Sequence, residues 1–240
     1  SDIEMFNKTT DYYINKNQPF MTYYLTVSGH LNYNFYGNNM AEKHKKEVEN
    51  LGYSEEIKAY FATQIELDKS MEYLLNELEK NNLLKDTLII IAPDHYPYGL
   101  TEKQINEVSK INRDDKFELY HTSLIMYNPT IKKTIIDKTI SSIDILPTIY
   151  NLYGLEFDSR LFIGNDIFSE QEHIVILSDR SWITDKGKYN SVNSQFIKTT
   201  KEELEENYID KINKIVNEKY KISSLIIDND YYSKVEGKWK

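Results

Sequence analysis

The spacing of apolar and polar residues predicts two helices in the first third of the chain. Apolar residues recur at helical intervals over residues 2–14 and, for much longer, over residues 54–81. Asp68 falls on the apolar stripe of the second helix. A buried carboxylate needs a partner, so we expect Asp68 to be a hydrogen-bonded structural acid or a group that supports a nearby site. The polar, tyrosine-rich stretch 31–52 is expected to be a long surface loop.

Three short apolar runs are rich in aromatic and β-branched residues, a composition that favours strands. They cover residues 20–27, 87–92 and 122–127. The second run is continuously apolar, which is typical of a parallel strand buried on both faces. These runs alternate with helices, and we therefore predict an α/β fold with a mixed, largely parallel sheet flanked by helices.

The pattern changes near residue 170, where a smaller second part is expected. The apolar runs become short and resemble meandering strands, and Thr200 with Glu203 forms a capping box at the start of a helix. We expect strands at 174–177, 181–184, 191–197 and 224–227, and a helix from 200 to about 220. The predicted division is a main body over residues 1–169 and a small α+β subdomain over residues 170–240.

Composition excludes some classes of protein and leaves the compartment open. The 240 residues carry a formal net charge of -9, from 38 acidic and 29 basic residues. Nucleic-acid-binding proteins usually present a basic face, so we expect no nucleic-acid partner. Cysteine is absent, which excludes disulfides and thiolate sites. No run of about 20 apolar residues is present, so no membrane span is predicted within this sequence.

Asp94 and His95 are the most informative polar residues, because they follow directly on the run 87–92. In open α/β sheets, ligands bind in the crevice beyond the carboxyl ends of the strands. A carboxylate and an imidazole are ordinary ligands of Zn, Mn or Mg-type ions. An Asp-His pair is a weak motif by itself, and the alternative is that Asp94 caps the next turn and His95 is a loop histidine.

Two further histidines lie at the ends of predicted strands. His30 follows the run 20–27 and His121 precedes the run 122–127. If the strands are neighbours, both imidazoles converge with Asp94 and could bind a metal or a phosphoryl oxygen. His44 and His173 stand in polar surroundings and are expected at the surface. Metal-assisted transfer at phosphorus or sulfur also needs a hydroxyl nucleophile, and no residue here is recognisable as one.

Four segments in a fixed order carry a family resemblance. They are Phe20–His30, Pro93–Gly99, the segment Asp144-Ile145-Leu146-Pro147-Thr148 through Gly154, and Gly164-Asn165-Asp166-Ile167. Each segment alone is weak, but together and in this order they are specific. The chain resembles, over about residues 2–200, the carboxyl-terminal part of the lipoteichoic acid synthase-like branch of the sulfatase family, in the alkaline phosphatase superfamily.

The resemblance implies a catalytic domain on the extracellular face of a bacterial cell membrane, tethered by helices that precede it. Such enzymes transfer glycerol phosphate from a phosphatidylglycerol-type lipid onto a glycerol-phosphate polymer. They use a phospho-threonine intermediate and a divalent metal, most often Mn, with Mg or Zn as alternatives. Asp94 and His95 match the metal-binding pair, His30 matches a phosphate-binding histidine, and Thr101 matches a head-group contact if one extra residue is allowed before Gly99.

His121 departs from the synthase pattern. The sequence His121-Thr122-Ser123 is closer to a histidine motif of the related phosphoethanolamine transferases, so a phosphate or second-metal role is an open alternative. A sulfatase of the same superfamily and a non-catalytic binding module that kept the fold also remain open.

The resemblance places the glutamate metal ligand and the threonine nucleophile upstream of this chain. We therefore expect these residues to hold part of an active site and to be inactive and weak in metal binding when isolated. An incomplete sheet would expose an edge or an apolar face through which two copies could associate.

Overall fold

The structure is a computed structural model that describes residues 1–113 and 116–235. The chain forms two compact units, residues 1–134 and 135–240, and each is described here by itself. The two units divide after residue 134, whereas the sequence predicted a domain division after residue 169. The predicted subdomain over residues 170–240 stays a prediction. The last five residues of the predicted subdomain lie outside the described part of the chain.

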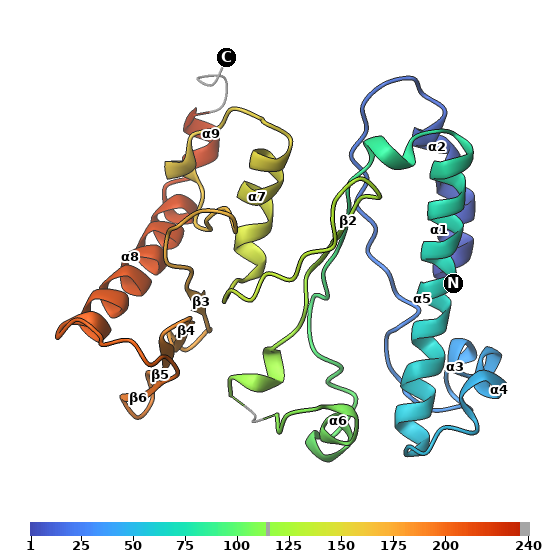
Figure 1. Cartoon of the computed structure of the whole chain (residues 1–240), viewed down its shortest axis with the longest axis horizontal. Helices are drawn as coiled ribbons and strands as arrows, with labels where there is room; N and C mark the ends of the chain where they lie inside the picture. Colours follow the sequence, from blue (N-terminus) through green and yellow to red (C-terminus); the bar gives the residue numbers. More distant parts are fainter. Residues whose placement is uncertain (114–115, 236–240) are drawn as a thin grey trace. The chain divides into compact units, whose positions relative to one another are not determined.

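Unit 1 is built around one long helix and a short pair of strands (Figure 1). The predicted helices are confirmed, but the stretch expected to be a loop also contains two short helices, α3 and α4. The elements are α1 (Asp2–Thr9), α2 (Asp11–Ile14), α3 (Asn39–Lys43), α4 (Lys45–Val48), α5 (Glu55–Lys80), η1 (Leu84–Asp86), β1 (Ile89–Ile91), α6 (Glu102–Val108), η2 (Glu118–Tyr120) and β2 (Ile125–Tyr127).

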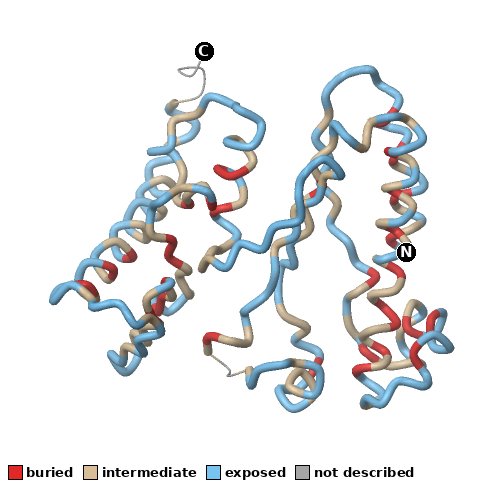
Figure 2. Tube along the Cα trace, viewed as in Figure 1, coloured by how far each residue is buried: buried red, intermediate tan, exposed pale blue. Residues whose placement is uncertain are grey.

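Buried positions are spread along α5, as the colours of Figure 2 show, and from Ala62 to Leu78 they include a stripe of every fourth residue. Its buried residues include Ile57, Ala62, Glu66, Ser70, Leu74 and Leu78. Asp68 lies away from this stripe and is exposed, so the prediction of a buried carboxylate there was wrong. The buried acid of α5 is Glu66 instead. Two hydrophobic clusters pack against the helix, one near Ile57 and the other near Leu78.

β1 and β2 pair in the antiparallel direction, with Ile89 opposite Tyr127 and Ile91 opposite Ile125. Both sheets formed by the described residues are antiparallel, so the α/β class is confirmed but the largely parallel direction was wrong. A continuous apolar run does not by itself report the direction of its neighbour. Antiparallel pairing places the end of β1 and the start of β2 at the same end of the pair.

Residues 20–27 were expected to form a strand, and among the described residues they have no ladder partner. Within the segment only Phe20 and Tyr24 are partly buried, so its burial does not alternate as in a strand. Phe20 and Tyr24 pack with the cluster around Leu78, whereas Met21, Tyr23, Leu25 and Val27 are exposed. At its end, the Asp2 carboxylate accepts hydrogen bonds from the backbone N–H groups of Val27 and Ser28, at 2.9 and 3.0 Å. These side-chain bonds replace ladder bonds there.

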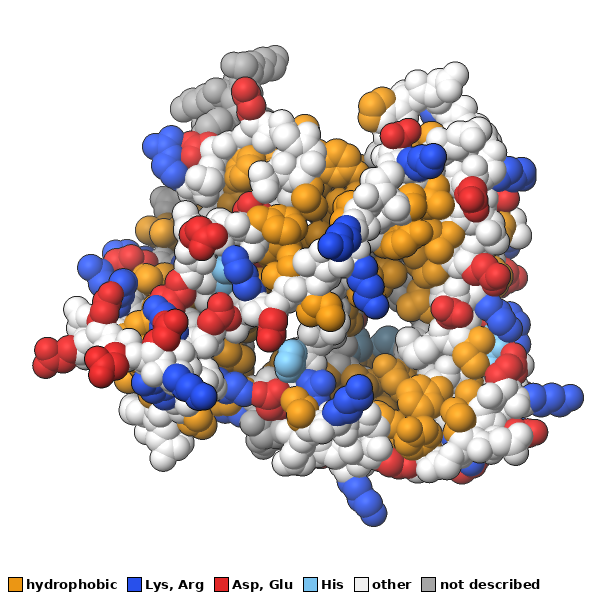
Figure 3. Space-filling model, in the orientation of Figure 1, with side chains coloured by type: hydrophobic (Ala, Val, Ile, Leu, Met, Phe, Trp, Pro, Cys, Tyr) orange, Lys and Arg blue, Asp and Glu red, His pale blue; other side chains and the backbone are white. Residues whose placement is uncertain are grey.

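The exposed row on this segment predicts self-association of the chain. Figure 3 shows hydrophobic side chains over a broad part of the surface of unit 1, and an unpaired apolar edge is a template for another strand. We expect the Leu25→Lys variant to weaken association about tenfold or more, because a charge replaces apolar surface that association would bury. Sedimentation equilibrium across a range of concentrations measures this. Ile227→Lys, at an exposed helical site in unit 2, is the control, and equal association of both variants would contradict the prediction.

Unit 2 combines helices with a four-stranded antiparallel sheet in the order β3-β4-β5-β6. Trp182 is fully buried between this sheet and Ile212 of α8. The helix predicted from residue 200 begins at Tyr208 instead, so the predicted Thr200 capping box was wrong. The same helix includes residues 224–227, so the strand predicted there was also wrong. The elements are η3 (Ser142–Asp144), α7 (Ile145–Leu152), η4 (Ser159–Leu161), β3 (Val175–Ile176), β4 (Trp182–Thr184), β5 (Gly187–Asn190), β6 (Gln195–Lys198), α8 (Tyr208–Asp228) and α9 (Tyr231–Val235).

Two of the motif segments, the one that begins at Asp144 and the one that begins at Gly164, contact each other in unit 2. The buried Asp144 carboxylate accepts from the backbone N–H groups of Ser141 and Asn165, at 2.9 and 2.8 Å. A Cβ on Gly164 would lie 2.0 Å from the Ile143 carbonyl oxygen, so only glycine allows this approach. The order and residue types of these motifs are therefore explained by packing between the start of α7 and the 164–167 turn.

Thr148 also joins these two segments, and its hydrogen bonds give a prediction about stability. Its buried hydroxyl donates to the Asp144 carbonyl at 2.6 Å and accepts from the Ile167 N–H at 3.0 Å. Thr148→Val keeps the shape but leaves the Ile167 N–H without a partner, which costs about 1–3 kcal/mol. Urea denaturation of the two proteins measures this. Thr148→Ser keeps the hydroxyl and should lose less, and equal losses would show that the methyl group matters as much as the bonds.

Candidate functional site

His30, His95 and Tyr98 form a contiguous group in unit 1. The ring centroids of His30 and His95 are 6.1 Å apart, and Tyr98 lies 4.7 Å from His95 and 6.0 Å from His30. The Tyr98 hydroxyl is 3.1 Å from His30 Nε2. The expected convergence of His30 with the Asp-His pair is therefore present in the structure, although the segment before His30 is not in a ladder.

The His95 ring is oriented by a hydrogen bond to the backbone. Its Nδ1 lies 2.7 Å from the Tyr96 carbonyl oxygen, which can only accept, so Nδ1 carries the proton. The lone pair of Nε2 is then free, and Nε2 lies 3.6 Å from Asp94 Oδ1. Metal-binding histidines usually donate their second N–H to a backbone carbonyl or carboxylate in this way. Asp94 is 68% exposed at the side chain, so its oxygens are accessible.

This pair is an incomplete ligand set. Within residues 1–113 and 116–235, no group of three or more His, Asp or Glu side chains is arranged to hold a metal ion. Asp94 and His95 supply one oxygen donor and one nitrogen donor, the types that Mn and Zn accept. The donor types fit a divalent metal, and further ligands must come from elsewhere. The metal roles of Asp94 and His95 stay predictions.

The loop that carries His30 is held from both sides. Before it, Ser28 accepts from the Asp2 N–H at 2.8 Å, in return for the bond that Asp2 accepts from Ser28. After it, the Asn38 amide donates to the carbonyl oxygens of His30 and Asn32, at 3.2 and 2.9 Å. Asn38 is also the N-cap of α3, where its Oδ1 accepts from the N–H groups of Met40 and Ala41. The position of His30 therefore depends on the position of α3.

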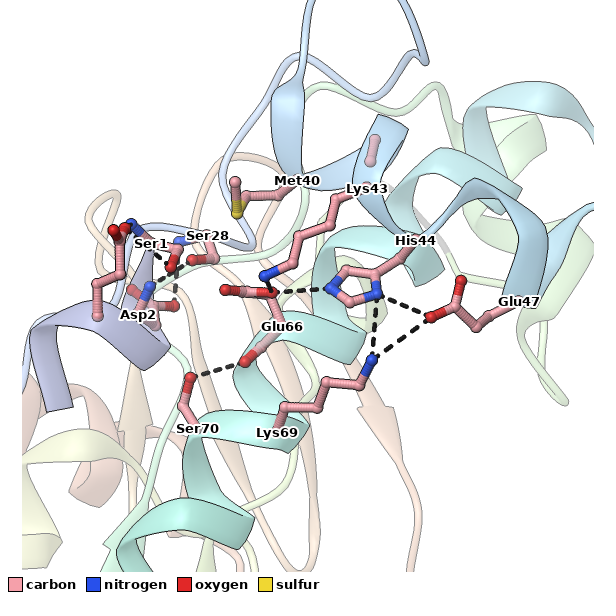
Figure 4. A network of polar contacts seen from close by, with 12 residues as sticks. Ser1, Asp2, Ser28, Met40, Lys43, His44, Glu47, Glu66, Lys69 and Ser70 are labelled. Atoms are coloured by element: carbon pink, nitrogen blue, oxygen red, sulfur yellow. Dashed lines mark hydrogen bonds and ion pairs between the residues drawn. The ribbon is translucent and has the colours of Figure 1, made fainter. Parts of the chain in front are cut away.

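α3 is attached to α5 by a buried ionic network (Figure 4). The fully buried Glu66 carboxylate accepts from Lys43 Nζ at 2.8 Å and pairs with His44 Nε2 at 2.7 Å. On its other side, His44 Nδ1 lies 3.0 Å from Glu47 Oε1, which also pairs with Lys69. Burial raises the pKa of Glu66, but the bonds from His44 and Lys43 outweigh it and lower the pKa to about 2.

Both histidines that were expected at the surface are buried, so that prediction was wrong. His44 is 2% exposed because Glu66, an acid inside the core, gives it a partner. His173 is also 2% exposed, and its Nδ1 lies 3.8 Å from the buried Asp144 carboxylate. Polar neighbours in sequence did not indicate exposure, since the decisive partners are 22 and 29 residues away.

His121 and Thr101 lie close to this region but are engaged differently. His121 Nδ1 is 3.3 Å from Glu118, and the Arg113 guanidinium holds its carbonyl at 2.6 Å. In the described part of the chain, no hydrogen bond or ring contact joins His121 to His30 or His95. The Thr101 hydroxyl donates to Gln104 Oε1 at 3.0 Å and accepts from the Gln104 N–H, so Thr101 forms a capping box at the start of α6. Substrate-binding roles for both stay predictions.

Three residues of the site region escaped the sequence reasoning. Tyr98 was included in the Pro93–Gly99 segment without a role of its own, Asn38 was placed in a polar loop, and Glu66 was overlooked in favour of Asp68. A signal was available for Asn38, because Asn followed by an alanine-containing helical turn is a good N-cap. For Glu66 the four-residue spacing with Ala62, Ser70 and Leu74 was readable, but its small and polar members hid it.

Comparison with known proteins identifies the family. A model of the sulfatase family matches residues 1–155, which is more than half of the chain. The chain belongs to the sulfatase family. It is 30% identical over 195 residues to the lipoteichoic acid synthase of Staphylococcus saprophyticus, covering 78% of this chain and 29% of that protein. It is 27% identical over 221 residues to lipoteichoic acid synthase 2 of Bacillus subtilis, covering 89% and 33%.

The fold of this sulfatase-family chain is also found in a solved structure. It superposes on the crystal structure of the lipoteichoic acid synthase LtaP from Listeria monocytogenes with a TM-score of 0.73 at 18% identity, over 95% of this chain and 60% of that one. The resemblance deduced from the motifs is confirmed. The chain spans about a third of the length of the curated relatives it matches. Among the described helices, none has the length and hydropathy of a membrane span.

Proposed function

We propose that this chain is part of a metal-dependent transferase that moves glycerol phosphate from a phosphatidylglycerol-type lipid onto a glycerol-phosphate polymer. The observation that supports it most directly is the orientation of His95, with Nδ1 bonded to Tyr96 and Nε2 beside Asp94. The synthase names of the relatives support the reaction class. We also propose membrane anchoring and an extracellular position for the whole protein.

In this proposal each candidate site residue has a defined role. Asp94 and His95 hold a divalent metal of the Mn type, with Mg or Zn as alternatives. The metal would neutralise charge on the phosphoryl group and lower the pKa of the attacking hydroxyl. His30 hydrogen-bonds a phosphoryl oxygen and so keeps phosphorus in line for attack. Thr101 and His121 would contact the head group, and the hydroxyl nucleophile would lie outside these residues.

A direct assay tests this function. Diacylglycerol release from a phosphatidylglycerol analogue is followed with the full-length protein and with this chain alone, each with added Mn and with a chelator. We expect Mn-dependent release by the full-length protein and none by the chain alone. Release by the chain alone would place the nucleophile within residues 1–240 and overturn the division of the site.

The same assay separates the rival functions. Hydrolysis of an aryl sulfate in preference to the lipid favours a sulfatase, and transfer from phosphatidylethanolamine favours a phosphoethanolamine transferase. The His121-Thr122-Ser123 sequence is the observation that favours the latter. Inactivity on all three substrates, with metal bound or not, would favour a binding module that kept the fold.

A further inference from the structure

Tyr98 contacts both histidines of the candidate site, and although it lies in the Pro93–Gly99 segment, the resemblance gives it no role of its own. It lies three residues after His95, within the Tyr-Pro-Tyr-Gly turn. Its hydroxyl reaches His30 Nε2 at 3.1 Å, and its ring lies against His95 at 4.7 Å. One side chain therefore connects the predicted metal ligand with the predicted phosphate-binding residue.

We propose that Tyr98 is a positioning residue that fixes the orientation of the His30 imidazole toward the substrate phosphoryl group. The proposal rests on the proposed function, because only there does His30 bind a phosphoryl oxygen. Apart from Tyr98, the only hydrogen-bonding contact of the His30 ring in the described residues is Nδ1 to the Leu31 carbonyl, at 3.5 Å. That distance is too long to orient a ring.

The direction of the hydrogen bond follows from these partners. A phosphoryl oxygen can only accept, so in this proposal His30 presents Nδ1–H to it, and the lone pair of Nε2 faces Tyr98. The Tyr98 hydroxyl then donates to Nε2. A phenol is a good donor to imidazole and cannot rotate away without moving its ring, which is held edge-on against His30 with an interplanar angle of 80°.

Packing between two loops keeps Tyr98 in place. Leu100 is buried in the cluster that contains Tyr33. A Cβ on Gly99 would lie 3.1 Å from both Leu31 Cβ and the Tyr33 ring, so the turn packs closely on the loop that follows His30. The Tyr33 hydroxyl in turn donates to the Gly29 carbonyl at 3.2 Å. The contact between Tyr98 and His30 is thus a consequence of how the loops pack.

The first test is kinetic and uses the full-length protein. Tyr98→Phe removes only the hydroxyl, and we expect KM for a phosphatidylglycerol analogue to rise about tenfold while kcat changes less than about threefold, because a lost binding contact acts on KM. In a His30→Ala background the same change should have no further effect. Tyr36→Phe, which removes a phenol hydroxyl from a 93% exposed residue of the same unit, is the control. Additive losses in the double variant would overturn the proposal.

The second test does not depend on activity. Nitrogen-15 NMR of the imidazoles in the metal-free 240-residue chain reports which His30 nitrogen carries the proton. We expect a single Nδ1–H form in the wild type and an averaged pattern in Tyr98→Phe, with the Tyr36→Phe control unchanged. Identical His30 patterns in wild type and Tyr98→Phe would overturn the positioning role. If the NMR difference is found but no protein releases diacylglycerol, the proposed function fails while the contact between Tyr98 and His30 stands.

Discussion

Asp94→Ala is expected to reduce transfer by the full-length protein about a thousandfold or more. A metal that stabilises charge on a transferring phosphoryl group contributes several kcal/mol to the transition state, and each 1.36 kcal/mol is a factor of ten in rate. Removing one of the two ligands that we propose for this chain should lower both metal affinity and rate. Two measurements check this: diacylglycerol release at saturating Mn, and Mn affinity by calorimetry.

The structure offers a matched control for this variant. Asp86 is an exposed aspartate before β1 in the same unit, whereas Asp94 follows the strand. Asp86→Ala should leave activity and Mn affinity unchanged. Because the Asp94 side chain is 68% exposed, neither change should alter the free energy of unfolding by more than about 0.5 kcal/mol. Full activity of Asp94→Ala with normal Mn affinity would remove the metal role from this residue.

Local features of the candidate site could be predicted from the sequence, whereas the direction of its strands could not. Asp94 and His95 were recognised because an apolar run ends at two ligand-type side chains, a local signal. The direction of the neighbouring strand is a long-range property, and the run at 87–92 contains nothing that reports it. The correction matters for His121. In a parallel sheet, the start of its strand would lie at the opposite end from His95, whereas antiparallel pairing puts both at the same edge.

The buried position of Glu66 is another long-range property that the local sequence does not report. The helical period of residues 54–81 is readable, but which stripe faces inward depends on what packs there. Apolar size favoured the stripe through Phe61 and Asp68, whereas the structure buries the stripe through Glu66. An acid is acceptable at that position only because α3 and α4 bring Lys43 and His44 to it. These helices lie in a stretch whose polar composition favoured a loop.

Glu66→Gln is expected to lower the free energy of unfolding by about 3 kcal/mol at pH 7. The fall of the Glu66 pKa from 4.5 to about 2 corresponds to that amount of stabilisation by the ionised form. The variant keeps the size of the side chain and loses the charge that faces Lys43 and His44. Urea denaturation at several pH values measures the difference between the two proteins.

The pH dependence separates a charge effect from a packing effect. The pKa of Glu66 is lowered in the folded state, so its contribution is fully present above pH 4.5 and is lost as pH falls toward 2. The difference between wild type and Glu66→Gln should therefore be constant from pH 7 to about 5 and shrink below 4.5. A difference that stays constant down to pH 3 would mean that shape, not charge, makes Glu66 important.

Glu47→Gln supplies the control, because Glu47 contacts the same imidazole from the solvent side. Its carboxylate is 44% exposed, and water replaces the lost interaction, so the loss should be much smaller than for Glu66→Gln. The consequence extends to the site. If Glu66 attaches α3 to α5, its loss should also loosen Asn38 and the His30 carbonyl that Asn38 holds. Amide hydrogen exchange over residues 30–38 should then rise in Glu66→Gln and stay unchanged in Glu47→Gln. Equal exchange in both variants would mean that the His30 loop is held by Asp2 and Tyr98 without help from α3.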